Sequence, residues 1–182
     1  MDHMIEMTLR NLIVGGGPIP SAIILQPARE NAQDETVTDG QNELVLPISV
    51  GTVDAANVAR ATNADEHKRP ATHALLVDTI DALGAELESV SITRVEGDTF
   101  FATLDIRSAT GEQHHIDSRP SDAISAAIEA DVPVLASEDV LQRAGLPDFA
   151  AVRRDEQERE AAEFHDFVEN LTPDDFKAPK QN

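Results

Sequence analysis

The segment from residue 90 to residue 118 limits the possible folds most strongly, because apolar and polar residues alternate along it. A Glu-Gly-Asp turn at 96–98 and a second turn at 108–111 interrupt the alternation. A two-residue period is typical of strands that bury one face. Such a meander needs a covering layer on its apolar side. The residues expected on that side are Val90, Ile92, Phe100, Ala102, Leu104, Ile106 and Ile116.

Helical patterns on both sides of the meander can supply the covering layer. Pro70 and Pro120 each begin a helix, since proline suits the first helical position. Gly84 stands where the first of these helices should be capped. Shorter helices are expected at 53–61 and, with a serine cap, at 138–143. The residues expected to face the core are Leu76, Ile80 and Leu83 in the first helix and Ile124, Ala127 and Ile128 in the second.

Other short segments rich in Ile, Leu and Val are typical of strands, namely 5–14, 20–26, 44–50 and 133–135. The first two are expected to form a hairpin, and Pro47 in the third indicates an edge or a bulge. The sequence therefore predicts an α+β fold, with a mixed, mainly antiparallel sheet and helices packed on it.

The chain divides by composition. We expect one domain over residues 5–146, with an acidic, solvated loop at 28–43. Residues 147–182 are highly charged, and we expect them to form a helical extension that ends in a frayed tail.

The chain is strongly acidic, because 14 Lys and Arg stand against 34 Asp and Glu, a net charge of −20. Such a surface repels polyanions at long range and argues against tight binding of nucleic acid. A high-salt cytoplasm favours this composition, and in molar salt the Debye length is only about 3 Å. A halophilic protein and an ordinary acidic protein from a high-GC organism both fit.

Cysteine is absent, which excludes disulfides, zinc–thiolate sites and thiol catalysis. No apolar run reaches the length of a membrane span, and the N-terminus lacks the order of a signal peptide. We therefore expect a cytoplasmic protein with no membrane partner.

Two segments share a design in which an arginine precedes a proline at a helix start. They are Arg69-Pro70-Ala71-Thr72-His73 and Arg119-Pro120-Ser121-Asp122-Ala123. In each, the free amides and positive end of a helix lie beside an arginine, which suits a phosphate. Ordinary helix capping is the competing interpretation. The candidates for phosphate binding are Arg69, Thr72 and Ser121.

Acidic groups surround the second helix start. If Ile116 points inward, Asp117 and Arg119 share the opposite face. Asp117 at the strand end and Asp122 in the first helical turn are expected to meet, and together they could hold Mg²⁺ or Mn²⁺ that activates water. A pair of carboxylates held by Arg119 is the architectural alternative. His73 is a candidate general base.

A set of short motifs runs from residue 46 to residue 124 in fixed order. They are Leu46-Pro47-Ile48, Gly51, Asp54-Ala55, Arg69-Pro70-x-Thr72-His73, Leu83-Gly84, Thr99-Phe100-Phe101-Ala102 and Asp117-x-Arg119-Pro120-Ser121-Asp122-Ala123-Ile124. In this order and spacing the chain resembles the bifunctional nuclease domain family over residues 44–145. Asp54 stands where that family usually has glutamate. The resemblance implies hydrolysis of DNA and RNA on an α+β fold that looks dimeric.

Two functions remain open at this level. In the first, the chain is a metal-assisted, non-specific nuclease in which Asp117, Asp122, Arg119 and His73 are catalytic. In the second, it is a non-catalytic binding or regulatory domain, and the Arg-Pro helix starts are structural or bind a small anion or a protein. In both cases we expect a homodimer, because an exposed sheet edge favours self-association.

Overall fold

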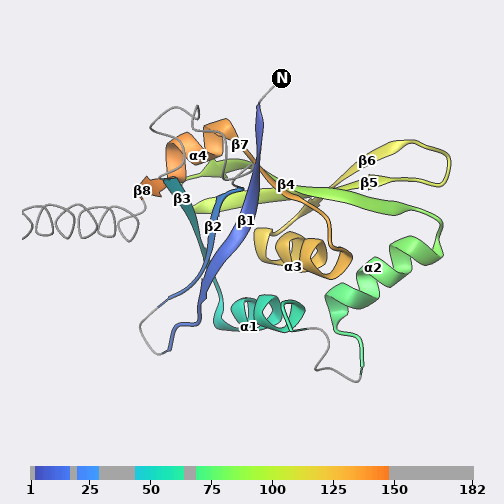
Figure 1. The fold of residues 1–182 in the computed structure, drawn as a ribbon, viewed down its shortest axis with the longest axis horizontal. Helices are drawn as coiled ribbons and strands as arrows, with labels where there is room; N and C mark the ends of the chain where they lie inside the picture. Colours follow the sequence, from blue (N-terminus) through green and yellow to red (C-terminus); the bar gives the residue numbers. More distant parts are fainter. Residues whose placement is uncertain (1–2, 17–19, 29–43, 64–68, 148–182) are drawn as a thin grey trace, which may run out of the picture. The chain divides into compact units, whose positions relative to one another are not determined.

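In the described part of the chain, eight strands form one sheet in the order β6-β5-β4-β7-β1-β2-β3-β8 (Figure 1). The computed structural model describes residues 3–16, 20–28, 44–63 and 69–147. Neighbouring strands are antiparallel, except that β4 and β7 are parallel. The strands are β1 (Met4–Ile13), β2 (Ser21–Pro27), β3 (Leu44–Val50), β4 (Glu86–Glu96), β5 (Thr99–Arg107), β6 (Gln113–Ser118), β7 (Val134–Ser137) and β8 (Leu146–Pro147).

Helix α3 is the centre of the helical layer. It contacts α1 and α2 on its flanks and the strands β4 and β5 beneath it. The helices are α1 (Thr52–Ala61), α2 (Thr72–Ala82), α3 (Pro120–Ala130) and α4 (Glu138–Ala144). Helices on a mixed, mostly antiparallel sheet confirm the predicted α+β fold.

The core lies between the sheet and these helices. Its largest fully buried side chains are aliphatic, as a chain with six Phe and no Trp or Tyr requires. They come from β2, β3, β4 and α3, and include Ile23, Leu25, Leu46, Ile48, Ile92 and Ile124. In β5 the predicted alternation is confirmed, because Ala102 and Leu104 are buried.

Several local predictions are also confirmed. β1 and β2 form an antiparallel hairpin. β3 pairs with β8 only at Leu44 and Val45, so it is an edge strand at Pro47. The Ser137 hydroxyl accepts a hydrogen bond from the Val140 amide and caps α4.

The structure corrects the prediction for α2. The helix begins at Thr72, two residues after Pro70. In the predicted core-facing stripe, Ile80 is buried, whereas Leu76 and Leu83 are 38% and 76% exposed. The helix packs mainly on α3 rather than on the sheet, and its buried residues are His73 and Ile80.

The burial predicted for Ile116 is also wrong. Ile116 lies opposite Leu104, on the core-facing side of the sheet, but it is 48% exposed. In the described part of the chain, β6 is the edge strand and pairs with β5 alone, and no helix packs extensively on it. The homodimer expected from such an edge stays a prediction.

The acidic loop at 29–43 and the extension after residue 147 lie outside the described residues. Within the described ranges, no helix has both the length and the apolar character needed to cross a membrane.

Candidate active site

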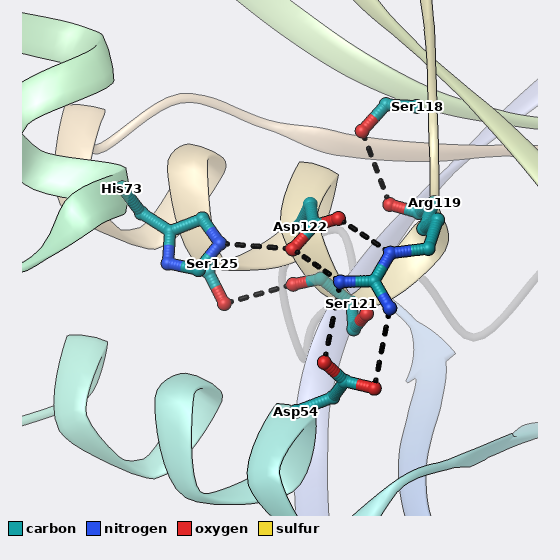
Figure 2. Close-up of polar contacts among 7 residues, drawn as sticks. All are labelled: Asp54, His73, Ser118, Arg119, Ser121, Asp122 and Ser125. Atoms are coloured by element: carbon teal, nitrogen blue, oxygen red, sulfur yellow. Dashed lines mark hydrogen bonds and ion pairs between the residues drawn. The ribbon is translucent and has the colours of Figure 1, made fainter.

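The second Arg-Pro segment turns the chain sharply from β6 into α3. Arg119 is the N-cap of α3, with an extended backbone at φ −73° and ψ 145°, and Pro120 follows in the first turn. A residue before proline is pushed out of the helical region, which explains this conformation. The turn places the guanidinium of Arg119 over the first turn of its own helix (Figure 2).

Arg119 and Asp122 form a two-point ion pair at this helix start. Nε of Arg119 donates to Oδ2 of Asp122 at 2.7 Å, and Nη2 donates to Oδ1 at 3.1 Å. The planar guanidinium matches both carboxylate oxygens, so the pair holds the arginine in one orientation.

His73 joins this pair from α2. Its Nε2 donates to Oδ1 of Asp122 at 3.1 Å (Figure 2). His73 is buried and lies in the first turn of α2, at the other Arg-Pro segment. The two Arg-Pro segments therefore meet at Asp122.

Asp54 of α1 completes the network and was not among the site residues predicted from the sequence. Its two carboxylate oxygens accept hydrogen bonds from Nη1 and Nη2 of Arg119 at 3.5 Å and 3.3 Å. The available signal was its place in the Gly51-x-x-Asp54 motif. A Cβ at Gly51 would stand 3.1 Å from Oδ2 of Asp54, so the glycine leaves this carboxylate room to reach Arg119.

The network keeps Asp122 ionised. Burial raises the pKa of Asp122, but hydrogen bonds from Arg119 and His73 outweigh burial and bring the pKa below its ordinary value. Hydrogen bonding and charge attraction from Asp122, with a further contribution from Asp54, raise the pKa of Arg119. The site therefore carries two carboxylates around one guanidinium at neutral pH.

A pocket of about 300 Å³ adjoins this network. It lies where β3 leads into α1, where the β4–β5 hairpin turns and where α3 begins. Its lining residues are Ile48, Ser49, Val50, Gly51, Asp54, Asp98, Thr99, Phe100, Arg119, Pro120 and Ser121.

Comparison with known proteins agrees with the motifs at this site. The model of the bifunctional nuclease domain matches residues 37–148, more than half of the chain. The chain belongs to the bifunctional nuclease domain family. The matched range includes α1, α2 and α3, which supply the whole network.

Relatives of this bifunctional nuclease domain occur in Mycobacterium tuberculosis. Proteins from two strains, both described as uncharacterized, are 36% identical to the chain over 148 residues. The match covers 77% of this chain and 85% of each relative.

The remaining predicted residues of the bifunctional nuclease domain do not join the network. Arg69 and Thr72 are described and exposed, and neither lines the pocket. Asp117 is exposed and pairs in register with Thr103, across β5 and β6. Ser121 lines the pocket, and its role in phosphate binding stays a prediction.

Asp117 lies on the sheet face that carries a separate polar cluster around Asp105. The Asp105 carboxylate accepts hydrogen bonds from Ser91 at 2.6 Å, Ser89 at 3.0 Å, Thr103 at 3.1 Å and His115 at 2.8 Å. Residues opposite each other on paired strands share a face. The sheet thus places Asp117 with the cluster around Asp105 and away from α3.

The predicted metal pair is therefore not assembled. Both oxygens of Asp122 already accept hydrogen bonds from Arg119 and His73, and Asp117 lies on the other sheet face. Among the described residues, no group of three or more His, Cys, Asp or Glu side chains is arranged to hold a metal ion. The predicted donor set does not fit a divalent cation in this arrangement.

Proposed function

We propose that the chain is a nuclease that hydrolyses phosphodiester bonds in DNA and RNA. The observation that carries the proposal is the network of Asp54, Arg119, Asp122 and His73 beside the pocket where α1 and α3 begin. Family membership supports the choice of reaction.

Within this proposal, Arg119 is the group that meets the phosphate. Its side chain is 65% exposed and lines the pocket, so a ligand can reach it. A guanidinium held in one orientation stabilises the charge that develops on a phosphate during hydrolysis. Asp54 and Asp122 hold that guanidinium from two helices.

His73 acts through Asp122 in this proposal. It is buried, it does not line the pocket, and its described polar contact is the hydrogen bond to Asp122. We therefore assign His73 a positioning role, in place of the proton transfer expected from the sequence. Dependence on Mg²⁺ or Mn²⁺ stays a prediction.

The experiment is a cleavage assay with the purified full chain on single-stranded DNA and RNA. Reactions contain Mg²⁺, Mn²⁺ or EDTA, and KCl from low salt to molar concentration. We expect cleavage by the wild type and a loss of about 100-fold in Arg119→Ala, the usual cost of removing one group that stabilises transition-state charge.

Arg143→Ala is the matched control. Arg143 forms an exposed ion pair with Asp139 on α4, at 2.8 Å, away from the pocket. This variant should cleave like the wild type. Equal activity in Arg119→Ala and wild type would reject the assignment of Arg119.

A binding or regulatory domain is the second candidate. The hydrogen bonds of Asp122 favour this candidate, because both of its carboxylate oxygens are already bonded to Arg119 and His73. A carboxylate with these partners can simply stabilise the packing of α2 against α3. A folded chain that cleaves neither DNA nor RNA at any salt or metal condition would select this candidate over the nuclease.

A further inference from the structure

We propose that the pocket binds a single nucleotide, with the phosphate at the starts of α1 and α3 and the base against Phe100. The choice of a nucleotide rests on the proposed function. The test measures nucleotide binding without strand cleavage, so the nucleotide site and the nuclease activity can be rejected separately.

The phosphate end of the pocket is formed by two helix N-termini. Gly51 and Asp54 line it from the start of α1, and Pro120 and Ser121 line it from the start of α3. Neither N-cap residue, Gly51 of α1 or Arg119 of α3, caps its helix with a side-chain hydrogen bond. The first amides of a helix lack partners within the helix and attract anions. The guanidinium of Arg119, held by Asp54 and Asp122 but 65% exposed, offers further donors beside them.

Ser121 is the independent observation that points to a ligand. The residue is only 5% exposed and lines the pocket. Its hydroxyl has no hydrogen-bond partner among the described residues, although its carbonyl accepts a bond from Ser125. No fully buried side-chain oxygen among the described residues lacks a partner, so the Ser121 hydroxyl must still be open to the pocket that it lines. A phosphate oxygen at the helix start could accept its hydrogen bond.

The opposite side of the pocket suits a base. Phe100 packs against the core and also lines the pocket, so an aromatic ring borders the space that a base would occupy. Asp98, at the turn of the β4–β5 hairpin, lines the same side. Unlike Asp54, which is paired with Arg119, Asp98 has no ion-pair partner among the described residues. Its carboxylate therefore repels phosphate more strongly, and it can accept hydrogen bonds from the amino group of a base. These groups orient the ligand with its phosphate away from the hairpin.

The size of the pocket limits the ligand. About 300 Å³ lies at the lower end of the range for small-molecule sites. This volume accommodates about one nucleotide rather than a stacked run of bases. A strand seated here must therefore present one base unpaired, so we infer a preference for single-stranded or terminal nucleotides.

The test is isothermal titration calorimetry of the full chain with AMP, adenosine and inorganic phosphate. AMP should bind at least about tenfold more tightly than either fragment, because it fills both ends of the pocket. Ser121→Ala should weaken both AMP and phosphate about tenfold, the cost of one hydrogen bond to a charged group. Phe100→Leu should weaken AMP about tenfold and leave phosphate unchanged.

Ser125→Ala is the matched control, since Ser125 is a buried serine of the same helix that does not line the pocket. It should bind AMP like the wild type. A thermal melt of each variant separates lost binding from lost folding.

Each outcome separates the two proposals. Equal affinity for AMP and phosphate, no saturable binding of AMP, or AMP binding unchanged in both Ser121→Ala and Phe100→Leu would overturn the nucleotide site. AMP binding without strand cleavage would support the site and reject the nuclease. Strand cleavage without AMP binding would reject the site alone.

Discussion

His73 in α2 donates a hydrogen bond of 3.1 Å to Asp122 in α3, although 49 residues separate the two in sequence. This contact brings together the two Arg-Pro helix starts. Because Asp122 also binds Arg119, and Arg119 binds Asp54, three helices are joined through one chain of polar contacts (Figure 2). The network can therefore be tested through stability as well as through activity.

Asp122→Asn should lower the free energy of unfolding by about 2 kcal/mol, because it weakens hydrogen bonds to charged groups at a partly buried site. Urea denaturation at pH 7 measures the effect. Asp139→Asn is the control, since its exposed pair with Arg143 should contribute less than about 1 kcal/mol. Equal losses of unfolding free energy in the two variants would show that the contacts of Asp122 contribute no more than an ordinary surface ion pair.

Asp54→Glu should keep both stability and cleavage close to wild type. The Asp54 carboxylate reaches Arg119 at 3.3 Å and 3.5 Å, so one added methylene can maintain the contact. Asp54→Ala should instead reduce cleavage, because Arg119 is then held by Asp122 alone. Cleavage rates measured at one salt concentration compare the two variants. A loss of activity in Asp54→Glu as large as in Asp54→Ala would contradict the positioning role.

Ser121→Ala should leave the unfolding free energy unchanged or slightly higher, because the hydroxyl that it removes has no hydrogen-bond partner among the described residues. Ser125→Ala should cost about 1 kcal/mol, since the Ser125 hydroxyl donates to the Ser121 carbonyl at 2.8 Å. Urea titrations of the two variants give this comparison. A clear destabilisation by Ser121→Ala would mean that its hydroxyl has a role in the fold.

Acid should destabilise the domain through Asp105 as well as Asp122. Burial raises the pKa of Asp105, but hydrogen bonds from Ser91, His115, Ser89 and Thr103 outweigh it and lower the pKa below its ordinary value of 3.8. The unfolded chain then takes up the proton first as the pH falls. The stability contributed by ionised Asp105 is complete above about pH 4 and is lost as the pH falls below it.

Urea midpoints measured from pH 7 to pH 2.5 test this pH dependence. The wild type should lose stability steeply below about pH 4, and Asp105→Asn should be less stable at neutral pH with a flatter acid slope. An unchanged acid slope in Asp105→Asn would place the acid sensitivity elsewhere.

If the acidity is an adaptation to high salt, the melting temperature should keep rising as KCl approaches molar concentration. The net charge of −20 makes self-repulsion large, and salt screens it. An ordinary acidic protein should gain stability only over the first few tenths of a molar. A melting temperature that levels off early would therefore reject the halophilic interpretation.

The local elements were accessible from the sequence because each depends on neighbouring residues. Alternation predicted the β4–β5 hairpin, and Pro120 predicted the start of α3. Gly84 was predicted as a helix cap, and it has the left-handed φ of 74° that glycine adopts easily after a helix. In each case the signal lies within a few residues of the structure that it specifies.

Predictions that depended on residues distant in sequence were wrong or incomplete. The stripe on α2 was wrong because its periodicity did not reveal that α3, rather than the sheet, is the main partner. β7 was predicted only as a short strand, yet it pairs with β1 on one side and with β4 on the other and so joins the two halves of the sheet. Such pairings bring together segments far apart in the chain, which no local pattern encodes.

The same division applies to the site. The sequence by itself determined that Arg119, Ser121 and Asp122 stand at a helix start, because proline and the residue before it restrict the backbone there. Only the tertiary structure decided which groups meet them. Packing of α1 and α2 against α3 brought Asp54 and His73 to Arg119 and Asp122, whereas the two faces of the sheet kept Asp117 apart.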